Sequence, residues 1–219
     1  MPIPKHILEL LALTLLEEGS SGAFHAGVAL LVAFDTFARH GEMHLLRNKD
    51  VLLPGSPANF LEKEGTIYLR KTKSGVAQAV ALDNHELNQI LRMFMAGRDP
   101  NSNEALFEFG RGPRGGQRDL LWWLKWAQKA VGYVDIEFLV HGTRHGGATH
   151  AYMTKERTVL QIKLRGRWKS LVVCELYLQA NQARLAAAHV PEAVASYFRG
   201  DLQKARREIR RFFGLRPSG

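Results

Sequence analysis

The chain has 219 residues, and its 30 lysine and arginine residues outnumber its 21 acidic residues to give a formal net charge of +9. A hydrophobic content of 46% with 23% charged residues is typical of globular proteins and excludes an intrinsically disordered chain. The length suits one large domain, or a domain with an appendage. The longest apolar run, residues 26–34, is shorter than the ~18 residues that a membrane span needs, so we expect no membrane partner.

The single cysteine, Cys174, cannot form an internal disulfide, which fits a reducing compartment. Residues 1–6 lack the charged region and cleavage site of a secretory signal. We therefore expect an intracellular protein. Nothing near Cys174 in the sequence would activate its thiol, so we interpret it as an unreactive core residue.

The positive charge is concentrated near the end of the chain. Residues 199–219 hold seven basic residues against two acidic ones, whereas the rest holds 23 against 19. A polyanion such as nucleic acid is the expected partner, although a basic tail alone would suit a membrane surface or an acidic protein equally.

Apolar residues at helical spacing predict a first helix over residues 4–18 and a second from about 20 to between 37 and 39. The second helix is apolar on nearly every side and should lie at the centre of the core. Arg39 comes where this burial ends. Taken alone, it is an ordinary surface residue that closes a helix, because cations favour helix C-termini, and Gly41 suits the turn that follows.

Residues 51–53 predict a strand, and alternating residues over 66–82 predict a β-hairpin whose turn includes Ser74 and Gly75. Lys71 and Lys73 flank this turn. A lysine at a hairpin tip is ordinarily just solvated, so neither would be singled out without other motifs.

Asp83 and Glu86 match a capping box and predict a helix that ends at Gly97. A further helix is expected over 119–131. It carries three tryptophans, Trp122, Trp123 and Trp126, which could stack on bases; their spacing favours a core position for at least two of them.

Helices are predicted over 143–154, 156–164 and 170–188, and Pro191 precedes one or two short helices within 191–213. The expected fold is mainly α with a small antiparallel β-sheet, an α+β class. We divide the chain into a catalytic-type domain over 1–188 and a basic helical tail over 189–219.

Three motifs follow one another after residue 140. His141 and Arg144 form an HxxR element, Gly166 is followed closely by Trp168, and Tyr177 comes nine residues after that tryptophan. Together with an arginine at a helix end and a lysine on a hairpin, this order resembles the tyrosine recombinases, the phage-integrase family. The resemblance covers about residues 20–180 and carries over these residues: Arg39, Glu42, Lys73, His141, Arg144, Trp168 and Tyr177.

The resemblance implies the tyrosine-recombinase catalytic-domain fold and a site-specific DNA recombinase or integrase of a mobile genetic element. Such an enzyme cleaves and rejoins double-stranded DNA through a 3′-phosphotyrosyl intermediate, here on Tyr177, without a metal or cofactor. It acts as a tetramer. A helix after the tyrosine often docks on a neighbouring protomer, and residues 191–213 could do this or could simply bind phosphates.

The residue types suit this chemistry. Arg39 and Arg144 match the non-bridging phosphate oxygens, because a guanidinium is a planar fork that stays charged. His141 can donate to the phosphate or take the tyrosine proton, since its pKa lies near working pH. Lys73 would protonate the leaving 5′ oxygen. Trp168 would offer its indole N–H to the phosphate or pack the site.

Some features depart from the family pattern. One extra residue follows Gly166, so Arg167 is a candidate to share the role of Trp168, and Lys71 is a candidate to replace Lys73. Arg39 lies too near the start of the sequence for the usual N-terminal clamp domain. The chain is therefore interpreted as a fragment, a truncated element-derived reading frame or a minimal enzyme.

Three alternatives remain. The first is a catalytically inactive or truncated DNA-binding remnant of an integrase. The second is topoisomerase-like relaxation of DNA, which shares the same chemistry; the short chain and the integrase-type motif spacing favour recombination over it. The third is a metal site built from His141, His145 and His150; it is disfavoured because Arg144 would repel a cation and no carboxylate lies between the first two histidines.

Overall fold

The computed structural model describes residues 1–56, 64–70, 77–110, 119–133, 136–178 and 180–215, and for residues 176, 177, 180 and 181 it describes the backbone only. The helices are α1 (Lys5–Glu17), α2 (Ser21–Thr36), α3 (His40–Leu45), α4 (His85–Phe94), α5 (Leu120–Ala130), α6 (His141–Met153), α7 (Val159–Gly166), α8 (Leu171–Tyr177), α9 (Ala180–Ala188), α10 (Glu192–Phe198) and α11 (Lys204–Phe212). The strands are β1 (Val51–Leu52), β2 (Gly65–Leu69) and β3 (Gln78–Leu82), preceded by a short 3₁₀ helix, Asn48–Asp50.

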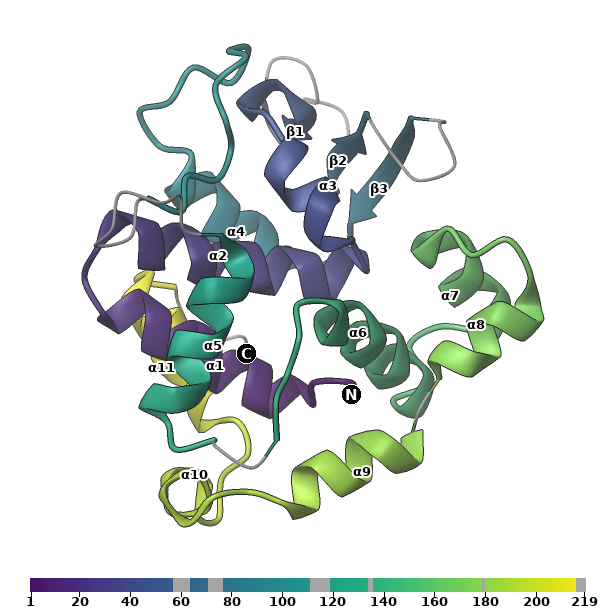
Figure 1. The fold of residues 1–219 in the computed structure, drawn as a ribbon. Helices are drawn as coiled ribbons and strands as arrows, with labels where there is room; N and C mark the ends of the chain where they lie inside the picture. The colour runs from purple at the N-terminus through teal and green to yellow at the C-terminus, as the bar shows by residue number, and fades with distance from the viewer. Residues whose placement is uncertain (57–63, 71–76, 111–118, 134–135, 179, 216–219) are drawn as a thin grey trace.

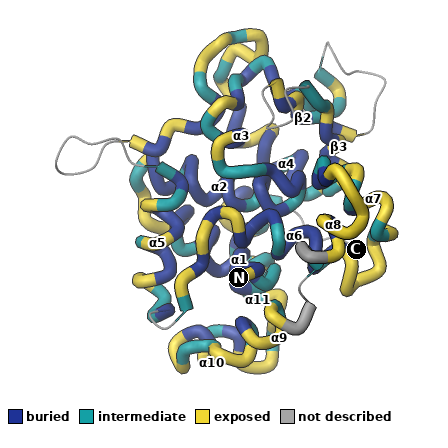
Figure 2. The backbone as a smooth tube through the Cα atoms, turned by 45° about the vertical axis from the view of Figure 1, so that its right-hand side comes forward, coloured by how far each residue is buried: buried dark blue, intermediate teal, exposed yellow. Residues whose placement is uncertain are grey.

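The central element is α2, as its sequence predicts. Its N-terminus is capped by the Ser20 hydroxyl, which accepts a hydrogen bond from the Ala23 N–H at 3.4 Å. Nearly all of the helix is buried, and it contacts α1, α4, α5 and α6 (Figure 2). It ends at Phe37, which adopts a left-handed conformation with φ of 50°. This conformation is uncommon for a residue other than glycine and breaks the helical path.

Two helix boundaries differ from the sequence-based expectation. Arg39 begins α3 instead of closing α2, so the interpretation of it as a C-terminal capping cation is wrong. The N-cap of α4 is Asn84, whose side chain accepts from the Leu87 N–H at 3.2 Å, rather than Asp83. Asp83 is engaged by arginines from elsewhere in the fold, which compete with the cap for its carboxylate.

The expected helix over 170–188 is also wrong in its continuity. Leu178 has ψ of 71°, outside the helical region, and separates α8 from α9. No glycine or proline marks this break in the sequence. The remaining predicted helices are confirmed, including the pair α10 and α11 after Pro191.

The three strands form one antiparallel sheet in the order β1-β2-β3, with Val51 opposite Ile67 and Ile67 opposite Val80. Ile67 is buried and its neighbour Tyr68 is 38% exposed, so one face of the sheet packs on the core. The hairpin and the α+β class are confirmed. Lys71, Lys73 and the residues of the turn lie outside the described part of the chain.

The tryptophans of α5 serve mainly the core. Trp123 is 1% exposed and donates its indole N–H to the Phe109 carbonyl at 2.9 Å, and Trp126 packs partly buried against the same core. Trp122 is 39% exposed. Cys174 is buried as expected, and burial raises the pKa of its thiol.

The C-terminal segment packs on the body of the same chain. Ala205, Ile209 and Phe213 are buried in the main core, and α11 contacts α1 (Figure 1). Arg206 of α11 also pairs with Glu86 of α4 at 2.8 Å. Among the described helices, none combines the length and apolar character that a bilayer crossing requires.

Helix α6 approaches the N-terminal segment and α2 unusually closely, because glycines line its contact face. The Ile3 N–H donates to the Gly142 carbonyl at 3.0 Å. A Cβ atom on Gly146 would overlap the Ile3 backbone, and one on Gly147 would overlap the Phe34 carbonyl oxygen. Small residues here therefore set the position of the start of α6.

We expect Gly146→Ala to lower the free energy of unfolding by about 2 kcal/mol or more, because the added methyl group meets backbone that cannot rotate away. Gly41→Ala in α3 is the matched control: nothing lies within 4 Å of its Cβ position, so we expect no loss, or a gain of about 0.5 kcal/mol. Urea unfolding of both variants measures the difference. Equal effects would contradict the close packing of α6.

Candidate functional site

Arg39 and Glu42 form a self-contained unit at the start of α3. The Glu42 carboxylate accepts the Arg39 backbone N–H at 2.7 Å and its guanidinium Nη1 at 2.9 Å. The first contact is the backbone half of a capping box. The Arg39 side chain is 29% exposed and that of Glu42 is 4% exposed. The buried carboxylate thus holds a partly exposed cation in a fixed place.

Arg144 lies within the protein, at 1% exposure. Its Nη1 donates to the Phe37 carbonyl and its Nη2 to the Gly166 carbonyl. The guanidinium carbon lies 4.4 Å from the centroid of the Trp168 ring, an arrangement that favours a cation. A Cβ on Gly166 would overlap the Trp168 ring, so glycine at position 166 is required for that ring to lie against the Arg144 guanidinium. Arg144 therefore joins α6 to the ends of α2 and α7.

Arg167 ends α7 in a left-handed conformation, with φ of 58°. Its Nη2 donates to the Phe37 carbonyl at 3.0 Å and to Glu42 Oε2 at 2.9 Å. Burial lowers the pKa of Arg167, and the charge of Glu42 opposes this shift. Glu42 consequently bridges two arginines, Arg39 and Arg167, that are far apart in the sequence.

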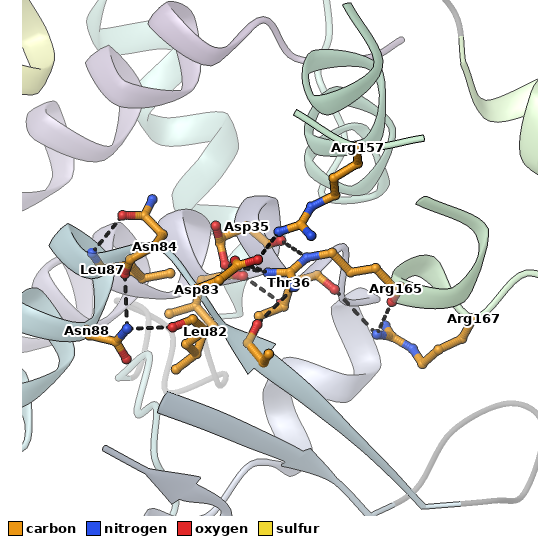
Figure 3. Close-up of polar contacts among 12 residues, drawn as sticks. Asp35, Thr36, Leu82, Asp83, Asn84, Leu87, Asn88, Arg157, Arg165 and Arg167 are labelled. Atoms are coloured by element: carbon orange, nitrogen blue, oxygen red, sulfur yellow. Dashed lines mark hydrogen bonds and ion pairs between the residues drawn. The ribbon is translucent and has the colours of Figure 1, made fainter. Parts of the chain in front are cut away.

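The carbonyl end of α2 is the meeting point of these side chains. A third arginine, Arg165, donates from Nε to the Asp35 carbonyl at 2.8 Å, and Arg167 also reaches the Thr36 carbonyl at 3.3 Å (Figure 3). Carbonyl groups in the last turn of a helix have no partner within the helix and carry partial negative charge. Three guanidinium groups supply both the donors and the positive charge that this end needs.

His141 begins α6 and is exposed, and its ring contacts that of His145 edge to face, with centroids 4.6 Å apart. Burial, followed by the charges of Arg144 and Arg39, lowers the pKa of His141. Burial and His141 lower the pKa of His145 to about 3. Both imidazoles are therefore neutral at pH 7, and a neutral imidazole accepts protons.

The structure brings together most of the predicted residues. Arg39 contacts Glu42, and Arg144 contacts Trp168. Arg167 links the two pairs, because it donates to Glu42 and to the Phe37 carbonyl that also accepts Arg144. His141 lies near enough for the charges of Arg144 and Arg39 to lower its pKa. Tyr177 is the last residue of α8, which contacts α6 and α7, and the structure describes only its backbone. Lys71 and Lys73 lie outside the described residues altogether.

The described contacts of His150 involve other residues than those of this site. It packs near Phe34 and lies 3.8 Å from the Glu156 carboxylate. Within the described ranges, no three histidine, cysteine or acidic side chains are arranged to hold a metal ion. The structure offers the three-histidine site no support.

Sequence reasoning overlooked Arg165 as a functional candidate, together with its partner Asp35. These two residues lie 130 positions apart, and their pairing at 2.8 Å has no signature in local spacing. The presence of two arginines around Gly166 gives no local signal of this pairing, because cations favour helix C-termini in general.

We expect Glu42→Gln to lower the free energy of unfolding by about 3 kcal/mol, because the buried Arg167 charge would lose its carboxylate partner. Glu192→Gln is the control, since it breaks an ion pair whose side chains are 75% and 85% exposed and should change stability negligibly. Thermal or urea unfolding measures both. Similar small effects would show that Glu42 is not structurally important.

No family model matches the sequence, and no curated protein matches it. Solved structures match the fold. XerH site-specific recombinase bound to difH substrate superposes with a TM-score of 0.60 at 20% identity, over 85% of this chain and 51% of that chain. XerA recombinase matches with a TM-score of 0.57 at 17% identity, over 99% and 66%. A lambda integrase dimer bound to a COC′ core site gives 0.54 at 15%, over 82% and 48%.

The chain thus spans about half the length of XerH and of lambda integrase. At identities of 20% or less, these superpositions establish a shared architecture and no more than that. The chain has the fold of a tyrosine-recombinase catalytic domain.

Proposed function

We propose that this protein is a site-specific recombinase or integrase that cuts and rejoins double-stranded DNA through Tyr177. The observation that carries the proposal is that Arg39 and Arg144 are linked through Glu42 and Arg167, with His141 close enough to feel both charges, on a fold shared with site-specific recombinases. XerH was solved with its difH substrate and lambda integrase with a core site, which supports DNA as the partner. The net charge of +9 is consistent with a polyanion.

In the proposed reaction the Tyr177 oxygen attacks the scissile phosphorus, and the bond from phosphorus to the 5′ oxygen breaks. The 3′ phosphate remains on the tyrosine, which conserves the energy needed for rejoining. Neutral His141 accepts the phenol proton. Lys73, or Lys71 in its place, gives a proton to the leaving 5′ oxygen. No metal or cofactor takes part.

Arg39 and Arg144 stabilise the charge that develops on the non-bridging oxygens, a contribution worth ~3 kcal/mol per donor in other enzymes. The two arginines differ in access, because Arg39 is partly exposed and Arg144 is 1% exposed. We propose that Arg39 and His141 meet the phosphate first. Arg144 then meets the phosphate with its guanidinium still held by the Phe37 and Gly166 carbonyls, after side chains that cover it move aside.

The catalytic residues all lie within residues 1–188, and we propose that the active assembly is a tetramer on DNA. The basic segment 189–219 contains α11, whose apolar face packs on the core of its own chain. Docking of this buried face on a neighbouring protomer would require α11 to leave that position first.

A second candidate function is DNA binding without cleavage. One observation favours it: Arg144 is buried and donates to two backbone carbonyls, as a purely structural arginine would. The two functions differ in whether a covalent adduct forms.

We expect the protein to remain covalently attached to duplex DNA after capture from a random library in EDTA and washing with SDS. Tyr177→Phe should abolish the adduct and leave DNA affinity nearly unchanged, because only the nucleophilic oxygen is lost. Tyr152→Phe, an exposed tyrosine on α6, is the matched control and should retain capture. Absence of any adduct alongside normal binding would favour the non-cleaving alternative.

We also expect a pH dependence from His141. The fraction in the neutral, proton-accepting form rises with pH, and because the pKa is lowered the rise is centred below the ordinary value of about 6.5. Single-turnover cleavage should therefore rise to a plateau with a midpoint below ~6.5. His141→Gln should be slower and should lose this acid limb. A rate that falls as pH rises through this range would instead indicate that protonated His141 acts as a donor.

A further inference from the structure

Arg165 is the centre of a buried ionic cluster at the end of α7. Its side chain is 7% exposed and contacts Asp35 twice, with Nε on the carbonyl and Nη2 on Oδ2, both at 2.8 Å. Nη1 donates to the Ala81 carbonyl of β3 at 2.9 Å, and Nη2 lies 3.4 Å from Asp83 Oδ1. Arg157 binds the other oxygen of Asp83 (Figure 3). One planar fork thus joins α7 to α2 and to the sheet.

The position of Arg165 relates this cluster to Arg144. The next residue, Gly166, supplies the carbonyl that accepts Arg144 Nη2. Two residues after Asp35, Phe37 supplies the carbonyl that accepts Nη1. Arg165 therefore ties together the two backbone segments whose carbonyls fix the plane of the Arg144 guanidinium.

The charges of the cluster depend on one another. Burial raises the pKa of Asp35, and the charge of Arg165 opposes that shift. At Asp83 burial also acts upward, but the hydrogen bond from Arg157 and the charge of Arg165 hold its pKa below the ordinary value. Arginines face both carboxylates, and the lowered pKa of Asp83 keeps that carboxylate charged, so the cluster is held by charge as well as by direct hydrogen bonds.

We propose that Arg165 is a positioning residue for the cleavage reaction: by clamping Gly166 to the end of α2, it sets the orientation in which Arg144 meets the scissile phosphate. This role rests on the proposed function. It assigns no contact between Arg165 and DNA, since the side chain is buried and its fork is occupied by protein acceptors.

The test uses Arg165→Lys, which keeps a positive charge beside Asp35 but replaces the fork with one ammonium group. Arg157→Lys is the matched control, because Arg157 lies in the same cluster and contacts Asp83 without touching the α2 end or Gly166. Each variant is assayed for single-turnover cleavage, for DNA affinity and for thermal stability. The substrates are a normal phosphodiester and a methylphosphonate at the scissile position.

A methyl group in place of a non-bridging oxygen removes the negative charge that Arg144 stabilises. Arg144→Ala, the reference variant, should therefore be severely slowed on the phosphodiester and much less on the methylphosphonate. We expect Arg165→Lys to follow this pattern, with cleavage of the phosphodiester slowed about 10- to 100-fold and cleavage of the methylphosphonate within about threefold of the parent protein. Arg157→Lys should match the parent on both substrates.

Equal slowing of Arg165→Lys on both substrates, or no slowing on either, would overturn the proposal. If Arg165→Lys does not fold, the double variant Arg165→Met with Asp35→Asn removes both buried charges and is held to the same criteria. If the parent protein forms no Tyr177 adduct, the proposed function fails and this role for Arg165 fails with it. If the parent cleaves and Arg165→Lys shows no selective loss, only the role of Arg165 is refuted.

Discussion

The carbonyl end of α2 is the constraint on which the site depends. Its last carbonyls, on Asp35, Thr36 and Phe37, lie in partly buried or buried contacts, and a buried carbonyl without a donor costs free energy comparable to a lost hydrogen bond. Three arginines from α6 and the end of α7 satisfy them. Because these arginines also bind Asp35 and Glu42, the ends of α2, α3 and α7 are joined through charge.

Such an arrangement is demanding for a protein to maintain. A buried ion pair contributes little net stability compared with apolar packing, yet the loss of one partner costs ~3–5 kcal/mol. Arg167 and Glu42, with side chains 3% and 4% exposed, illustrate this asymmetry. A purely structural junction could use apolar residues. Positive charge held next to an exposed His141 is instead useful for a reaction that handles phosphate, which is the proposed function.

The placement of α6 depends on a second feature, the glycines on its contact face. Glycines at 142, 146 and 147 allow its backbone to approach Ile3 and Phe34, and this approach brings His141 and Arg144 to the end of α2. The packing of α11 on α1 completes the core on the other side of the N-terminal helix. Close backbone packing places His141 and Arg144 near the end of α2, and hydrogen bonds to the Phe37 and Gly166 carbonyls hold the Arg144 guanidinium there.

The sequence by itself determined the α+β class, the hairpin, most helix spans and the recombinase-like order from Arg39 to Tyr177, because apolar periodicity and motif spacing are local. It allowed α2 to run as far as Arg39, which instead caps the start of α3, and it placed the cap of α4 at Asp83 instead of Asn84. It also did not reveal the break at Leu178. Only the tertiary structure decided that Arg144 is buried and that Arg165 forms an ion pair with Asp35. Those contacts join residues more than 100 positions apart, and the fold alone sets which buried acceptor each arginine meets.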